Sequence, residues 1–349
     1  MHTYTGIAET ILAQRLAAPE NIHPSWSNAK EVIRTFMRAL AYNGLSSDNS
    51  ADQAIRLTSK NRYDSLAEAT ERFLHDCRDY NHAVVNTGLN LHNEDTGSIF
   101  GSDAEVGNSL NAEDVIPEEG ELSEDLPDVI HKVGLTLYVP SNLSEAQKNI
   151  VRALNTWWLE NNLKIIKEGY GISFEDPGTT FSDMNLRFIR DTELGILAYV
   201  NFSTVNGQIL RNREFVINET YFENYNTSDP NGMPKDLWAK FYLDRIIAHE
   251  LVHAVMGATM PGFGMLPLFL KEGAAELIHG IDDVRSFTIN GILRSTTCQD
   301  ILRQYSDPTI RYAVNLLDDD KRKQNQEGFY VTGYLFLRWM AKQWRETFV

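Results

Sequence analysis

The run from Leu243 to Gly280 constrains the fold of this 349-residue chain more than any other stretch. It contains an H-E-x-x-H motif, from His249 to His253, inside a segment whose apolar residues recur at helical spacing. Residues four apart on a helix project from the same face, so the two imidazoles can bind one metal ion together. Glu250 lies a step around the helix, where its carboxylate can reach a metal-bound water without ligating the metal. The motif predicts a metal-binding helix. The alternative is a buried helix whose two histidines are hydrogen-bonded core residues.

A second acidic cluster, from Glu272 to Glu276, follows in a helical run of its own, and eighteen residues separate His253 from Glu272. A catalytic zinc site needs a third protein ligand and an open position for water. Glu272 is the predicted third ligand, which gives one catalytic Zn²⁺ held by His249, His253 and Glu272. Glu276 lies one turn further on the same face. We expect its carboxylate to accept the other ring N–H of a ligating histidine, as such carboxylates commonly do.

This pair of motifs, H-E-x-x-H and then E-G-x-A-E, resembles the gluzincin metallopeptidases, the clan of thermolysin and the alanyl-aminopeptidases. More narrowly, residues 243 to about 285 resemble the flagellinolysin-type metallopeptidase domain, with a looser likeness through about residues 100 to 340. The resemblance implies a zinc endopeptidase that hydrolyses peptide bonds of protein substrates by Glu250-assisted attack of a zinc-bound water. The chain has no recognisable flagellin-like termini, so a filament role and a flagellin substrate are not implied.

The resemblance also points to residues outside the two metal-binding helices. Gluzincins of the alanyl-aminopeptidase type carry a Tyr-x-x-Gly at the head of a later helix, and Tyr330 to Gly333 matches it. This implies that the Tyr330 hydroxyl supports the charge that develops on the substrate carbonyl oxygen. Tyr334 is the competing choice, and a packing aromatic is the alternative without a catalytic role.

A hairpin is expected before the metal-binding helix, from strand-like runs at 195–203 and 208–218 joined near Asn206-Gly207. In gluzincins the outer strand of such a hairpin pairs its backbone with an extended peptide. The resemblance therefore implies that Ala198 and Tyr199 bind substrate, whereas the residues alone fit an ordinary edge or inner strand equally well.

The expected fold class is α+β. The resemblance implies a thermolysin-like catalytic domain, in which a small mixed sheet carries the active-site helix and is followed by a helical C-terminal subdomain. A helical N-terminal region precedes it. The predicted domains are a helical region at 1–90, an acidic linker at 91–130 and the metallopeptidase domain at 131–349. Residues 91–127 hold eleven Asp or Glu and no Lys or Arg, a composition typical of a linker. The local predictions are strands at 134–139 and 184–189 and helices at 26–42, 66–85, 243–257 and 268–278. A further long helix is expected to follow a capping box at Ser144 and Gln147 and to run through Ile150 to a stop at Gly169.

Composition excludes several classes of partner. The formal net charge of −16 argues against nucleic acid and anionic membrane surfaces as partners. No segment approaches 18 uninterrupted apolar residues, so no membrane span is expected. No secretory signal is visible, which fits a cytoplasmic protein or export by a non-classical route. The two cysteines, Cys77 and Cys298, form neither a disulfide framework nor a Cys-type zinc site. The expected partner is a protein or peptide substrate.

Two other functions fit the motifs. The first is a zinc aminopeptidase of the gluzincin type, although the G-x-M-E-N-type motif that binds a free amine in that group is missing. The second is a non-enzymatic structural or adhesion protein with a structural zinc. Structural sites are normally closed by four protein ligands, and only three are recognisable here.

Overall fold

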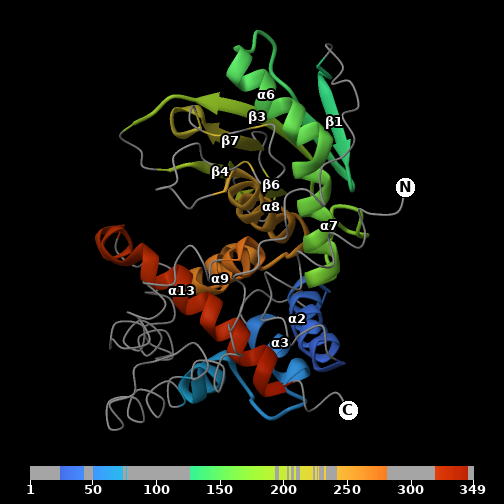
Figure 1. Cartoon of the computed structure of the whole chain (residues 1–349). Helices are drawn as coiled ribbons and strands as arrows, with labels where there is room; N and C mark the ends of the chain where they lie inside the picture. The colour runs from blue at the N-terminus through green and yellow to red at the C-terminus, as the bar shows by residue number, and fades with distance from the viewer. Residues whose placement is uncertain are drawn as a thin grey trace. The chain divides into compact units, whose positions relative to one another are not determined.

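The structure, a computed structural model, describes residues 24–42, 50–73, 76, 126–192, 196–202, 204–205, 208–209, 213–222, 225, 227, 232, 242–280 and 319–344. It is an α+β fold with N-terminal helices, a five-stranded mixed sheet and C-terminal helices, which confirms the predicted class at that level (Figure 1). The chain forms two compact units, one from residues 1–11, 108–168 and 172–259 and the other from 12–107, 169–171 and 260–349. The predicted linker lies outside the described residues up to residue 125, and the predicted domain boundaries stay a prediction.

The first unit contains the sheet, whose strand order is β1-β2-β3-β7-β4. The inner pairs β2–β3 and β3–β7 are parallel, and the outer pairs β1–β2 and β7–β4 are antiparallel. A separate two-stranded sheet pairs β5 with β6. The strands are β1 Val129–Lys132, β2 Leu135–Tyr138, β3 Asp183–Ile189, β4 Ala198–Asn201, β5 Thr204–Val205, β6 Gln208–Ile209 and β7 Glu214–Asn218. The expected hairpin is therefore β4 paired with β7 and continued by β5 and β6, with β4 at the end of the sheet.

Strand β1 was not expected from the sequence, and a tight turn explains its pairing with β2. Val133 and Gly134 both have positive φ, at 44° and 80°, as a two-residue turn between antiparallel strands requires. A side chain at Gly134 would also lie 2.7 Å from Cγ of Glu175. Valine rarely occupies the left-handed region, so the Val-Gly pair is a weak turn signal in the sequence.

The helical segment after β2 starts at the predicted cap. The Ser144 side chain accepts a hydrogen bond from the Gln147 backbone N–H, and the Gln147 side chain accepts one from the Ser144 N–H, which confirms the capping box. Three pieces follow without a break, namely α6 Glu145–Ala153, the π-helical segment η3 Leu154–Trp158 and α7 Leu159–Tyr170. Trp158 is buried, as expected for core packing. The π segment was not predicted, because apolar spacing does not register one wider turn inside a long helix.

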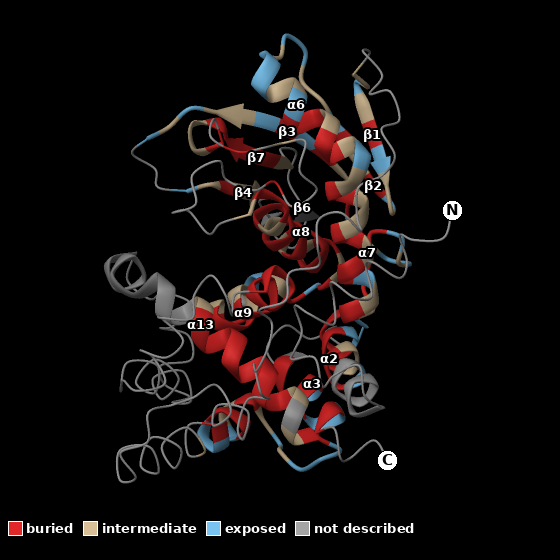
Figure 2. Ribbon diagram, in the orientation of Figure 1, coloured by how far each residue is buried: buried red, intermediate tan, exposed pale blue. Residues whose placement is uncertain are grey.

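The first unit also contains α8, Leu243–Thr259, which carries the H-E-x-x-H motif and lies against β4 and η3. It is buried on most of its surface (Figure 2). The Asn162 side chain donates a hydrogen bond to the Asp244 carbonyl oxygen at 2.9 Å, near the start of α8.

The second unit is helical, and α13 is at its centre. Its named helices are α2 Pro24–Tyr42, α3 Ser50–Thr58, α9 Leu268–His279 and α13 Asp319–Trp344. Helix α13 packs against α9 and α2, and every residue from Val331 to Met340 is buried. Phe336 lies in edge contact with both Phe73 and Phe269. Helix α3 lies within the predicted helical region at 1–90, although it was not predicted as a separate helix. The expected helix at 66–85 is helical at 66–73 and 76, and its remaining residues lie outside the described ranges.

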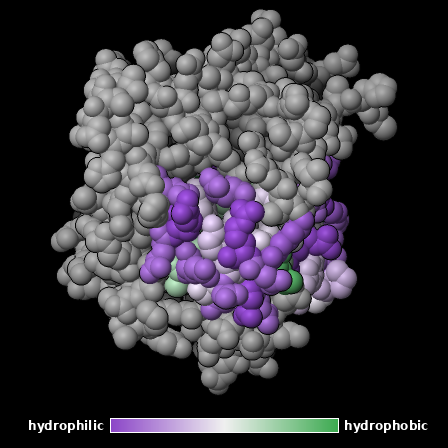
Figure 3. All heavy atoms as spheres, turned by 90° about the horizontal axis from the view of Figure 1, so that it is seen from below, coloured by the Kyte–Doolittle hydropathy of each residue, from purple (hydrophilic) through white to green (hydrophobic). Residues whose placement is uncertain are grey.

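Figure 3 views the side that carries α3 and the segment after it, where the described side chains are mostly hydrophilic. Exposed residues there carry both signs of charge, and they are Arg56, Lys60, Arg62, Asp64, Glu68, Glu71 and Arg72. None of the helices in the described part of the chain combines the length and the apolar character that a bilayer-spanning helix needs.

Candidate metal centre

Helix α8 brings the imidazoles of His249 and His253 together on one face. The ring centroids lie 4.8 Å apart at an interplanar angle of 80°, and Nε2 of His253 lies 3.1 Å from Nε2 of His249. Two nitrogens bound to one tetrahedral zinc, at about 2.0–2.1 Å each, would lie roughly 3.3 Å apart. The spacing of the two rings is therefore close to what a shared zinc ion requires, and only one of the two His249 nitrogens is directed to His253.

Glu272 completes a group that could hold a metal ion. One ligand atom from each of His249, His253 and Glu272 can be chosen so that all three lie within 4.8 Å of one another. Helix α8 ends at Thr259 and α9 begins at Leu268, with a 3₁₀ turn at Phe263–Met265 between them. Two imidazoles and one carboxylate fit a catalytic type of zinc site. The same ligand types also suit other divalent transition metals.

Glu276 and His279 form a second group with His249, by the same criterion of ligand atoms within 4.8 Å. Both side chains are nearly inaccessible, and Oε2 of Glu276 lies 3.8 Å from Nδ1 of His279. His249 thus belongs to both groups. His279 is grouped with Glu276 and His249, and not with His253. The i,i+3 spacing of Glu276 and His279 was the signal that could have revealed this pair.

Glu250 is held at the edge of the sheet. The backbone N–H of Val200, on β4, donates a hydrogen bond to Oε2 of Glu250 at 3.1 Å. Ala198 and Tyr199 lie on the same strand, opposite Ile217 and Val216 of β7. The Tyr199 hydroxyl accepts a hydrogen bond from Arg187 at 3.1 Å. Sequence reasoning did not identify Val200, because the contact uses its backbone and leaves no trace in the residue type.

Two glycines bring α9 and α13 into backbone contact. A Cβ at Gly273 would lie 2.2 Å from the carbonyl carbon of Gly333, and a Cβ at Gly333 would lie 1.8 Å from the Phe269 carbonyl oxygen. Gly273 follows Glu272 directly, and Gly333 comes one helical turn after Tyr330. This crossing explains why both motifs contain glycine at these positions: neither helix has room for a side chain there.

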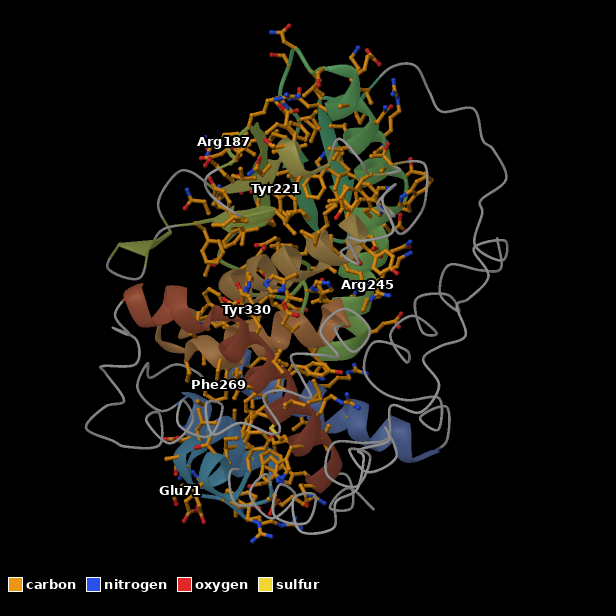
Figure 4. The ribbon with its side chains drawn as sticks, turned by 60° about the vertical axis from the view of Figure 1, so that its left-hand side comes forward. Glu71, Arg187, Tyr221, Arg245, Phe269 and Tyr330 are labelled. Carbon is orange, nitrogen blue, oxygen red and sulfur yellow. The ribbon has the colours of Figure 1, made fainter. Side chains whose placement is uncertain are left out.

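The two candidate tyrosines of α13 differ in their surroundings. Tyr330 is half-buried on α13 (Figure 4). Tyr334 is fully buried, and its hydroxyl accepts a hydrogen bond from the Arg338 guanidinium at 2.8 Å. Helix α13 begins at Asp319, so Tyr330 lies within the helix rather than at its head as expected. The polar run before Tyr330 lacks proline and is rich in good helix formers, which explains the earlier start.

A buried tyrosine supports α9 from another side. The Tyr170 hydroxyl donates a hydrogen bond to the Ala274 carbonyl oxygen at 2.5 Å. Burial raises the pKa of Tyr170 well above its usual value, so the hydroxyl keeps its proton and remains a donor. The contact fixes the backbone of α9 between the two acidic residues of the E-G-x-A-E motif.

The described residues therefore contain a candidate metal-binding group of two histidines on α8 and a glutamate on α9. In comparisons with family models, with curated proteins and with solved structures, the chain had no match. A function for this chain is therefore inferred from its side chains and their geometry.

Proposed function

We propose that the chain is a zinc-dependent endopeptidase with a gluzincin-type catalytic centre. The observation that carries this proposal is the grouping of His249, His253 and Glu272 next to Glu250, which itself takes no part in either metal-binding group. Such a set leaves a coordination position open, as catalytic rather than structural zinc sites do. Zinc held there would act as a Lewis acid on the scissile carbonyl and would acidify a bound water.

Glu250 is the proposed general base and acid. Its carboxylate takes a proton from the attacking water and passes it to the nitrogen of the leaving amine as the C–N bond breaks. Tyr330 donates a hydrogen bond to the oxygen on which negative charge develops. We prefer Tyr330 to Tyr334 because the Tyr334 hydroxyl is buried and bound to Arg338.

Glu276 is proposed to orient His249. A metal-ligating histidine usually donates its second ring N–H to a carboxylate, which selects the tautomer and the ring orientation. The group of His249, Glu276 and His279 supplies a buried carboxylate for that purpose.

Strand β4 is proposed to bind an extended peptide through its backbone. The Asn218 N–H donates to the Leu197 carbonyl oxygen at 2.9 Å, and Tyr199 lies opposite Val216. In an antiparallel ladder, residues alternate between turning their backbone groups toward the partner strand and away from it. Tyr199 therefore directs its N–H and C=O toward β7, whereas those of Ala198 point away from the sheet. We therefore propose that Ala198 binds the peptide through its backbone N–H and C=O, and that Tyr199 contacts the peptide through its side chain. Gripping by main-chain bonds suits an endopeptidase, because it does not depend on a chain terminus.

The experiment that tests the function is Glu250→Gln in the zinc-loaded full chain. We expect kcat for an internally quenched peptide with a blocked amino terminus to fall by about 10²- to 10⁴-fold, because glutamine cannot carry the proton. Zinc content, measured by elemental analysis, should stay at the wild-type level. The matched control is Glu71→Gln, the same change at an exposed position (Figure 4).

Undiminished cleavage by Glu250→Gln would refute this mechanism. His253→Ala should instead lose the metal. A wild-type chain that binds zinc but cleaves neither blocked peptides nor aminoacyl reporters would favour the structural-zinc alternative. Cleavage of aminoacyl reporters alone would favour an aminopeptidase.

A further inference from the structure

We propose that the backbone amide of Val200 is a positioning group for Glu250, so that an edge strand of the sheet fixes the proton-carrying carboxylate. This inference rests on the proposed function for its catalytic meaning. The contact itself is the 3.1 Å hydrogen bond from the Val200 N–H to Oε2 of Glu250. A backbone donor on a strand has fewer degrees of freedom than a side chain, so it restricts the carboxylate more strongly.

The direction of this amide follows from the register of β4 on β7. Tyr199 is a hydrogen-bonded partner of Val216, so its two neighbours along the strand direct their backbone groups away from β7. Strand β4 is the last strand of the sheet order, so no sixth strand of this sheet, among the described residues, takes up these groups. The Val200 N–H therefore points away from the sheet without breaking the ladder, and Glu250 receives it.

A second contact keeps α8 and β4 in place around this hydrogen bond. A Cβ at Gly257 would lie 2.2 Å from Cζ of Phe202, so the phenyl ring rests directly on the backbone of α8. Phe202 comes two residues after Val200, and Gly257 comes two helical turns after Glu250. Gly257 therefore shares a face of α8 with Glu250, and Phe202 directly follows the end of β4 at Asn201. The strand and the helix are thus joined at two points.

The consequence for the proposed reaction is a separation of roles along β4. The outward N–H and C=O of Ala198 are directed to a peptide, whereas the outward N–H of Val200 is directed to Glu250. Loss of this amide should leave peptide binding intact and impair the proton transfer. The Val200 side chain is irrelevant to the contact, so only a change that removes the N–H tests it.

The test is Val200→Pro, because proline lacks the N–H and is tolerated where an edge-strand amide faces away from its neighbour. We expect kcat to fall about tenfold to a hundredfold, as for a small misplacement of a catalytic group, with KM and zinc content unchanged. The matched control is Val129→Pro on β1, the opposite edge strand. The Val139 N–H donates to the Asp128 carbonyl oxygen, so the Val129 amide also points away from its partner strand. That control should keep wild-type kcat.

The kinetic constants of Val200→Pro distinguish a positioning role of the amide from a role in substrate binding. A rise in KM with kcat unchanged would assign the amide to substrate binding and overturn the proposal. Wild-type values of both kcat and KM would overturn it as well, because the amide would then have no role in the reaction. If Val200→Pro does not fold, replacement of Val200 by 2-hydroxyisovaleric acid removes the same N–H without a ring, and the same kinetic outcomes decide.

A stability measurement, which does not depend on peptidase activity, tests the hydrogen bond between Val200 and Glu250 separately from the proposed function. Urea unfolding of Val200→Pro, Glu250→Ala and the double variant forms a thermodynamic cycle on the full chain, with zinc and after chelation. We expect the double variant to lose less stability than the two single variants together. Additive losses would overturn the proposal. Coupled losses in a chain without peptidase activity would retain the contact and reject the proposed function.

Discussion

A methyl group added at Gly333 would collide with the backbone of α9. The Cβ of Gly333→Ala would lie 1.8 Å from the Phe269 carbonyl oxygen and 2.8 Å from Cα of Gly273. Non-bonded heavy atoms rest about 3.5–4.0 Å apart, so α9 and α13 would have to separate by roughly 1.5–2 Å. Both obstructing groups are backbone, so no rotamer change relieves the collision.

The expected cost follows from two opposing terms. Overpacking in a close-packed interior costs about 1–3 kcal/mol, and a collision with backbone belongs at the upper end of that range. Alanine regains up to about 1 kcal/mol over glycine in helix propensity. We therefore expect Gly333→Ala to lower the free energy of unfolding by about 2 kcal/mol.

Urea denaturation is the assay, with a lowered midpoint and an unchanged slope as the expected result. Gly264→Ala is the control, because a Cβ at that exposed position meets nothing within 4 Å. Gly273→Ala should also destabilise, and the double variant should cost less than the sum because one separation of the helices relieves both collisions. A Gly333→Ala chain as stable as Gly264→Ala would refute the backbone crossing. Under the proposed function, peptide cleavage by Gly333→Ala should also fall, since the crossing positions Glu272 and Tyr330, the proposed metal ligand and oxyanion donor.

Three further outcomes are expected. Ser144→Ala should lower the free energy of unfolding by about 1 kcal/mol through loss of the capping box, measured by urea denaturation with Ser144→Asp as the control that keeps a cap. Burial raises the pKa of Tyr225 to about 12, so the folded chain keeps a proton that the unfolded chain loses above its ordinary pKa of about 10. The contribution of the Tyr225 proton to the free energy of unfolding is complete below pH of about 10 and is lost as the pH rises towards 12, by at most about 1.4 kcal/mol per pH unit. In this pH window the urea midpoint of Tyr225→Phe should therefore fall less steeply than that of the wild type. Zinc at about a hundred times its Kd should raise the free energy of unfolding by about 2.7 kcal/mol, and the increase should disappear with chelator or in His253→Ala.

Local patterns predicted the elements whose signals lie within a few residues. The capping box at Ser144 and Gln147, the alternation of β3 and the extent of α8 were all readable, because each depends on spacing along one element. Strand β1 and the π segment at 154–158 were missed. A valine in a left-handed turn and a widened helical turn are both decided by packing against neighbours rather than by local preference.

Some features of the candidate site could likewise be predicted from local sequence, and others could not. The spacing of His249 and His253 made their grouping as candidate metal ligands predictable, since 3.6 residues per turn places both rings on one face. The E-G-x-A-E and Tyr-x-x-Gly motifs indicated which acid and which tyrosine to consider. The reason for their glycines, however, became clear only where Gly273 meets the backbone of Gly333.

The sequence by itself thus determined the α+β class, the helix that carries the candidate metal site and the candidate ligands, because helix and strand periodicity decide which side chains share a face. Only the tertiary structure decided that Glu276 and His279 form a second group with His249, that α9 and α13 touch through glycine, and that the Val200 amide holds Glu250. These relations join residues on different elements, and the direction of a backbone N–H depends on strand register, which no single residue type records.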